Sequence, residues 1–172
     1  MNRRTFLKTA GFSALAIALG VKVVAMARHY PLEQLLLQLK RLPAEKLSSS
    51  GQWSVSEILQ HLAQSVRYSR LGYPDAKSAL FQYTAGSAAL NAFAALGNMH
   101  HPLDEPIPGA PTLSSAVPKD VAMAELVTEL EQFIAWQGEL APHFAYGSLN
   151  KQQYYGAHYL HIQNHLQQIS LS

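Results

Sequence analysis

The sequence of 172 residues contains no cysteine. Disulfide bonds are therefore excluded, and no thiolate of this chain can act as a nucleophile or a metal ligand. Charged side chains are scarce, at 14% of residues, and none lies between residues 78 and 103, histidine aside. No segment alternates apolar and polar residues as a strand does, and no internal repeat is present. These absences favour one all-α domain whose metal sites, if any, use nitrogen and oxygen ligands.

The N-terminus lacks an apolar run of the roughly 20 residues that a membrane-spanning helix needs. Arg3 and Arg4 precede an apolar pair and a lysine, and a weakly hydrophobic stretch follows at residues 10–21. Residues 25–27 then offer an A-x-A cleavage site. This order predicts a twin-arginine signal peptide, so the expected partner is the twin-arginine export machinery and the expected location is the periplasm or another exported site. An uncleaved membrane anchor is the alternative.

The predicted signal peptide spans residues 1–27, and the predicted domain spans residues 28–172. Four of the thirteen basic residues lie in the signal, so the domain keeps nine against eleven acidic residues. The formal net charge thus changes from +2 to −2. The domain has no basic run and no interleaved aromatic and basic residues, so we do not expect it to bind nucleic acid.

Apolar residues recur at helical spacing in five segments of the domain. The predicted helices cover about residues 31–42, 55–71, 79–96, 119–141 and 151–172. The third has no charged residue, so we expect it to be buried on most sides; as a membrane segment it is too polar. In the fourth, Glu125, Glu129, Gln132 and Glu139 are expected on the outside. The pattern predicts an all-α bundle of four or five helices.

Two of these helices have strong start signals. Ser54 with Glu57, and Asn150 with Gln153, have the spacing of capping boxes, so Glu57 is more simply a capping residue than a general base. Trp53 stands at a hydrophobic staple position, and we expect its ring to be buried. Between the third and fourth helices, residues 98–118 hold five of the nine prolines. Such a connection is ordered and non-helical, and loops of this length are often functional lids.

Eight histidines are present, and three of them lie in the last helix. His158, His161 and His165 fall on one helical face, and a pair at i and i+4 can hold a divalent ion. His61 lies beside the apolar stripe of the second helix, with Ser65 and Tyr68 on the same side. The alternative is a set of hydrogen-bonded surface histidines. His100 and His101, in the proline-rich loop, are either solvated or approach the site as a lid.

Three short motifs carry a resemblance to a known superfamily. They are the stretch from Trp53 to Leu62, the pattern His161-x-x-x-His165-x-x-Gln168, and a P-I-P-G-A-P loop at residues 106–111. Together they resemble the DinB/YfiT-like superfamily of helical bundles, and within it a branch of unknown function. The resemblance implies a four-helix bundle with His61, His161 and His165 as ligands of one metal ion. His158 is then expected in the pocket wall or behind the ligands, with a role as fourth ligand as the alternative. Tyr68, Gln64 and Gln168 are further candidates for the pocket or for contacts behind the ligands.

Two functions follow from this combination. The first is an exported metal-dependent enzyme, a hydrolase or a thiol-dependent transferase, which uses Zn²⁺ or Ni²⁺ on a small-molecule substrate. The second is a non-catalytic module that binds a metal or small ligand or packs on a protein partner; a homodimer is one such assembly. A coordination position open to a polar pocket favours the enzyme, whereas histidines that are hydrogen-bonded and closed off favour the module.

Overall fold

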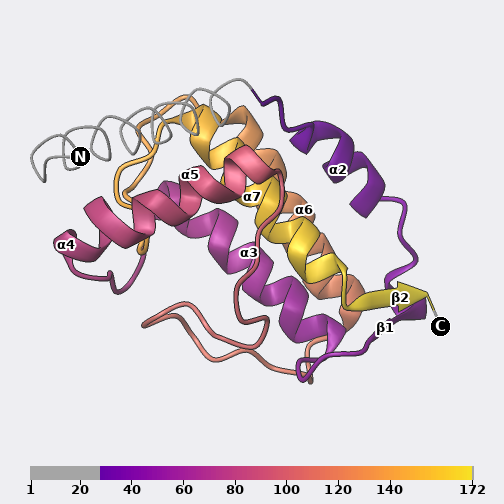
Figure 1. Ribbon diagram of the computed structural model, residues 1–172. Helices are drawn as coiled ribbons and strands as arrows, with labels where there is room; N and C mark the ends of the chain where they lie inside the picture. The colour runs from indigo at the N-terminus through magenta and orange to yellow at the C-terminus, as the bar shows by residue number, and fades with distance from the viewer. Residues whose placement is uncertain (1–27, 172) are drawn as a thin grey trace, which may run out of the picture.

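Figure 1 presents the computed structural model of the chain, which describes residues 28–171. The elements, in chain order, are α2 (Leu32–Leu39), a 3₁₀ turn (Ala44–Lys46), β1 (Leu47–Ser49), α3 (Val55–Leu71), α4 (Ala79–Phe81), the π-helical turn η2 (Gln82–Gly86), α5 (Ser87–Leu96), α6 (Lys119–Ala135), α7 (Lys151–Leu166) and β2 (Ile169–Leu171). The all-α prediction is confirmed, with five helices when α4, η2 and α5 are taken as one. The predicted signal peptide lies outside the described residues.

Helices α2, α3, α6 and α7 form the bundle, and the continuous helix α4–η2–α5 crosses α7 (Figure 1). The most extensive packing is between α3 and α6, while α7 contacts α2, α3 and α5. Their apolar faces meet in one core, whose fully buried members include Leu32, Ile58, Leu62, Leu126, Phe133, Tyr154 and Ile162. No helix within residues 28–171 is long and apolar enough to cross a membrane.

The start signals of α3 and α7 work as predicted. In α3 the Glu57 amide donates to Ser54 Oγ at 3.3 Å, and the Ser54 amide donates to Glu57 Oε2 at 2.8 Å. Asn150 and Gln153 make the same reciprocal pair at the start of α7. Because both caps satisfy backbone donors that a helix leaves unpaired, they fix where the two helices begin. The predicted bounds of α3 are confirmed at both ends.

Helix α6 ends at Ala135, so the predicted continuation to residue 141 is wrong. Trp136 is extended, with ψ near 130°. The Lys151 ammonium donates to the carbonyl of Ile134 at 2.8 Å and also to that of Trp136, satisfying two of the last carbonyls of the helix. Farther along, the Ala141 amide donates to the Ser69 carbonyl at 2.9 Å, which ties this segment to α3. Contacts with Lys151 and α3 therefore end α6 before the chain reaches Pro142.

The first and last helices of the described chain are also shorter than predicted. Helix α2 ends at Leu39 in a turn, and α7 ends at Leu166 instead of continuing to the C-terminus. Residues 169–171 form β2, which pairs antiparallel with β1 at one end of the bundle (Figure 1). Strands of three residues are too short for an alternating pattern to stand out in a sequence. Their pairing depends on segments that are more than 100 positions apart.

The charge-free helix at residues 79–96 exists as predicted, but the expectation that it is buried on most sides is wrong. Gly86 and Leu90 are its buried residues, whereas Leu80, Tyr83 and Leu96 are 74–75% exposed. Alanine-rich sequence does not mark one face as apolar, so the absence of charge carried no information about which side packs. Gly86 is needed because a Cβ there would lie 1.9 Å from the Ala145 carbonyl oxygen.

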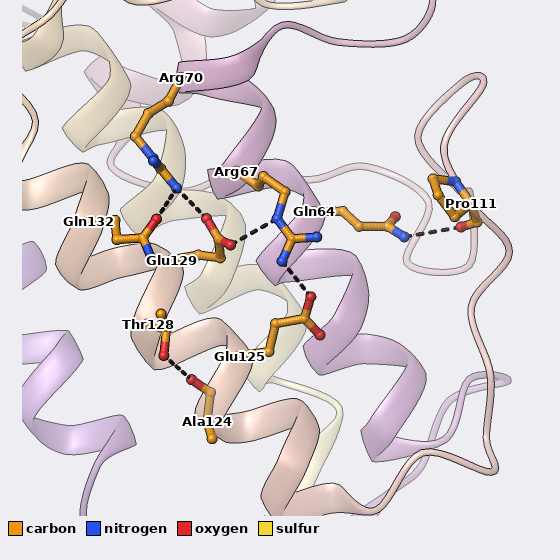
Figure 2. Close-up of polar contacts among 9 residues, drawn as sticks. All are labelled: Gln64, Arg67, Arg70, Pro111, Ala124, Glu125, Thr128, Glu129 and Gln132. Atoms are coloured by element: carbon orange, nitrogen blue, oxygen red, sulfur yellow. Dashed lines mark hydrogen bonds and ion pairs between the residues drawn. The ribbon is translucent and has the colours of Figure 1, made fainter.

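Glu129 is another correction, because it was expected on the outside of α6 and is buried, at 6% exposure. Arg67 Nε donates to its carboxylate at 2.8 Å, and Arg70 pairs with its other oxygen (Figure 2). Arg67 also reaches Glu125 at 2.7 Å, and Arg70 reaches Gln132 at 2.8 Å. A helical period does not distinguish an exposed carboxylate from one covered by arginines of a neighbouring helix.

Candidate metal centre

Three histidines from two helices meet inside the bundle. His61 lies in the middle of α3, and His161 and His165 lie one turn apart on α7. Their candidate ligand atoms are all within 4.8 Å of one another, and the Nε2 atoms of His61 and His161 are 3.2 Å apart. The three residues that the resemblance singled out are therefore brought together.

The ring positions agree with the geometry of shared ligation. The ring centres are 5.0 Å apart for His61 and His161, and 4.9 Å apart for both other pairs. With Zn–N bonds near 2.0–2.1 Å, two imidazoles on one tetrahedral ion have centres about 5 Å apart. The side chains thus already stand at the separation that one ion requires.

The cluster is neutral. Burial lowers the pKa of His61 to about 3, with His101 adding to the effect, and burial likewise lowers the pKa of His165 to about 3. The pKa of His161 is well below its usual value, first by burial and then by the neighbouring histidines. Neutral imidazole is the form that binds metal ions. His61 Nδ1 and His165 Nε2 are buried and have no hydrogen-bond partner among the described residues.

Trp53 and Gln168 flank the cluster. The Trp53 ring is nearly parallel to His165, with centres 6.3 Å apart, and lies 5.0 Å from His61. It is half-buried, so the expectation of a buried ring is only partly met. Gln168 Nε2 lies 3.4 Å from His165 Nδ1. Of the residues expected behind the ligands, Gln168 is therefore the one in direct contact with them.

A cavity of about 320 Å³ opens beside the cluster. His61, His161 and Ser65 form part of its wall, and Lys77 and Glu105 add two charged groups. The remaining wall is mainly apolar and includes Phe81, Met99, Ile107, Phe144 and Ala157. Two ligand candidates thus face a space large enough for a small molecule.

His158 also faces this cavity but is separate from the three clustered histidines. Its ring contacts Phe133 at 4.7 Å and Tyr154 at 5.3 Å between centres. Burial lowers its pKa to about 3, and its Nε2 has no hydrogen-bond partner within residues 28–171. The expected place in the pocket wall is where the structure puts it.

Gln64 and Tyr68 lie away from the cavity. Gln64 donates to the Pro111 carbonyl at 3.0 Å and so holds the proline-rich loop on α3 (Figure 2). Tyr68 packs on Tyr73, with ring centres 5.7 Å apart. Neither side chain lines the cavity among the described residues, so the structure does not bring them to the histidines. His61 faces the cavity, whereas Gln64, about one turn later on α3, faces the proline-rich loop.

Sequence reasoning missed His143, which lines the cavity from the segment between α6 and α7. Its Nδ1 accepts from the Ala145 amide at 3.1 Å, so a neutral ring carries its proton on Nε2. Burial lowers its pKa to about 3, and its ring stacks on Tyr146 with centres 4.3 Å apart. No spacing signal marks it, because it lies outside any helix.

A family model described as "Protein of unknown function (DUF1569)" matches residues 27–171. Comparisons with curated proteins and with solved structures found no match. The matched range covers every element of the bundle and all of the clustered histidines. The chain therefore belongs to the DUF1569 family.

Proposed function

We propose that this chain is a metal-dependent enzyme in which His61, His161 and His165 hold one divalent ion. The observation that carries the proposal is the meeting of three neutral imidazoles from two helices, with ligand atoms within 4.8 Å, at the wall of a cavity. His165 Nε2 is buried and lacks a hydrogen-bond partner among the described residues, and a bound ion would supply one. The three sequence motifs that contain His61, the His161–His165 pair and residues 106–111 support our proposal that the family belongs to the DinB-like superfamily.

Zn²⁺ and Ni²⁺ both fit this donor set. Imidazole suits both ions, and the cluster offers no thiolate or carboxylate that would favour softer or harder metals. Three protein ligands leave at least one coordination position for a further group, which is typical of catalytic sites. When bound, such an ion activates a water or a substrate thiol as a nucleophile.

The chain itself supplies binding and orientation. The apolar walls at Met99, Ile107 and Phe144 hold an apolar substrate body against His61 and His161 and exclude water. His143 and His158 are neutral, so they act on the substrate as hydrogen-bonding groups and not as charges. We therefore propose a hydrolase or a thiol-dependent transferase that acts on a small, largely apolar molecule.

A second candidate is a non-catalytic module. The exposed side chains of Leu80, Tyr83 and Leu96 on the α4–α5 helix favour it, because they offer an apolar surface to a protein partner or a second copy of the chain. The cavity beside the histidines favours the enzyme by its size and position, although its wall is mainly apolar instead of polar as expected. The two functions are separable, since the exposed surface lies on a helix that contributes no ligand.

We also propose export by the twin-arginine route, which Arg3 and Arg4 support. This route carries folded proteins, so the ion can be bound before export. Replacing both arginines by lysine should leave the precursor in the cytoplasm. Undiminished delivery of that variant to the periplasm would contradict the proposal.

The deciding experiment measures the metal content of protein purified without a histidine tag. We expect one ion of Zn²⁺ or Ni²⁺ per chain, lost on chelation and regained on titration. His161→Ala should lower the affinity by more than about 100-fold, because two imidazoles and water hold an ion far less well than three. His29→Ala is the control, since His29 is exposed. Substoichiometric metal, with equal affinity in both variants, would overturn the proposal.

A further inference from the structure

A fourth histidine reaches the cluster from the proline-rich loop. The ring centre of His101 lies 4.9 Å from that of His161 and 5.2 Å from that of His165. These separations match those among the three clustered rings, which run from 4.9 to 5.0 Å. They also match the spacing of about 5 Å expected for imidazoles on one ion. His101 therefore packs on two of the three clustered rings, although it is outside the group of three whose ligand atoms all lie within 4.8 Å of one another.

The proton of the neutral His101 ring is fixed on one nitrogen. Its Nδ1 lies 2.6 Å from the Pro102 carbonyl oxygen, which can only accept. Nδ1 therefore donates, and Nε2 carries the lone pair. Nε2 is buried and has no hydrogen-bond partner among residues 28–171. An imidazole whose outer N–H is held by a backbone carbonyl has the usual arrangement of a metal-ligating histidine.

The loop that carries His101 is held firmly on α3. Gln60 donates to the Ser114 carbonyl at 2.7 Å and accepts from the Ser114 amide at 3.2 Å. One turn later, Gln64 donates to the Pro111 carbonyl at 3.0 Å. Met99 and Ile107 are buried on either side of His101. His61 lies between the two glutamines on α3, so the loop is fixed at the ligand's own level of the helix.

We propose that His101 is a fourth nitrogen ligand of the ion held by His61, His161 and His165. The inference rests on the proposed metal centre. It makes the coordination sphere depend on the loop as well as on two helices. Because a four-coordinate zinc site can expand to five ligands during a reaction, a fourth imidazole is compatible with catalysis. His101 lines the same cavity as His61 and His161, so a substrate would approach the ion beside these three rings and bind as a fifth ligand.

Co²⁺ binding to the chelator-stripped full chain tests the proposal. Co²⁺ on four nitrogens is tetrahedral and absorbs strongly in the visible range, whereas added water ligands weaken this absorption. We expect His101→Ala and His101→Gln to keep one Co²⁺ per chain, to bind it at least about tenfold more weakly, and to absorb less. His100→Ala is the matched control, since His100 neighbours His101 but is exposed and contacts Asn98.

The outcomes separate the two proposals. Wild-type affinity and spectrum in both His101 variants would overturn the fourth ligand and leave the three-histidine centre standing. A wild-type chain that binds no Co²⁺ would overturn both. Thermal unfolding of the stripped variants shows whether each is folded. If His101→Ala does not fold, His101→Gln, which keeps a polar side chain, provides the test.

Discussion

Helix α3 carries two buried polar clusters on different faces, and they differ in how their polar atoms are satisfied. Toward α6, Arg67 and Arg70 share the carboxylate of Glu129, so opposite charges are paired within the chain (Figure 2). Toward α7, His61 meets two further imidazoles that are all neutral. In the arginine cluster only Arg70 Nε lacks a partner among the described residues, whereas the histidine cluster leaves a ring nitrogen unpaired on both His61 and His165.

This difference separates a structural role from a functional one. A buried ion pair whose partners are present holds two helices in register, and its role is complete within the protein. Buried nitrogens without partners cost free energy unless another group satisfies them. In the histidine cluster, His165 Nε2 is such an atom, and a bound ion would satisfy it. The variants and conditions that follow should break one cluster and spare the other.

Acid should have the largest effect, and it should act through the histidines. Burial lowers the pKa to about 3 in the folded chain for His61, His143, His158 and His165, against about 6.5 when unfolded. It also lowers the pKa of His161 well below its usual value. Their full contribution is present above pH 6.5 and is lost as the pH falls toward 3. Each adds a slope of up to about 1.4 kcal/mol per pH unit to the free energy of unfolding of stripped protein. Urea denaturation between pH 7 and pH 4.5 measures it.

Single substitutions show which histidines cause the pH dependence of the free energy of unfolding. His158→Gln should lower the slope, because it removes one buried titrating ring, whereas His100→Gln should leave it unchanged because His100 is exposed. A free energy of unfolding that stays constant between pH 7 and pH 5 would show that these rings are not held neutral.

Glu129→Ala should break the arginine cluster and spare the histidines. It leaves Arg70, whose side chain is 6% exposed, buried without its anion. We expect a loss of about 3–5 kcal/mol in the free energy of unfolding. Glu125→Ala is the control; its side chain is 34% exposed, and we expect a loss of less than about 1 kcal/mol. Co²⁺ affinity of the folded Glu129→Ala protein should equal that of wild type; a large loss would mean that the clusters are coupled.

Trp53→Ala should affect both stability and metal affinity, because the ring packs on His61 and His165. The ring is half-buried, so we expect about 2 kcal/mol, less than the 3–5 kcal/mol of a fully buried ring. Thermal unfolding with and without Zn²⁺ measures both effects. In a Trp136→Phe background, Ni²⁺ should also quench the fluorescence of Trp53. Fluorescence that does not change when Ni²⁺ is added would show that the ion binds elsewhere.

Ser54→Ala should have the smallest effect. The Ser54 hydroxyl accepts the Glu57 amide at the start of α3, and loss of such a cap costs about 1 kcal/mol. Both clusters lie farther along α3, so metal affinity should not change. Asn150→Ala, at the start of α7, is the matched variant on the other ligand-bearing helix. If metal affinity decreases together with stability in either variant, fraying of the start of that helix extends to its metal ligands.

The fold was predictable where local signals decide it. The start of α3 and the cluster residues of α7 follow from caps and spacing that a few neighbouring residues define. The early end of α6 was not predictable, because it depends on Lys151, which is 15 positions beyond Trp136 in the chain. The burial of Glu129 likewise depends on arginines about 60 positions away.

The site was predictable in its helical part only. His161 and His165 share a helical face, His61 lies beside the apolar stripe of α3, and the resemblance implied that the three bind one ion. His101 and His143 lie in segments without regular structure, where sequence spacing says nothing about direction in space. Trp53 was recognised as a staple residue, yet its contact with His165 depends on how α3 and α7 pack.

The sequence separation of the ligands has a kinetic consequence. His61 and His161 are 100 positions apart, so an incomplete chain that ends before α7 has no site. Contacts of such high sequence separation form late, after the loop-closure entropy has been overcome. An ion that binds only the assembled cluster then stabilises finished molecules and slows their unfolding, without helping earlier species to fold. Metal capture thus follows the assembly of α3 and α7 and reports that the bundle is complete.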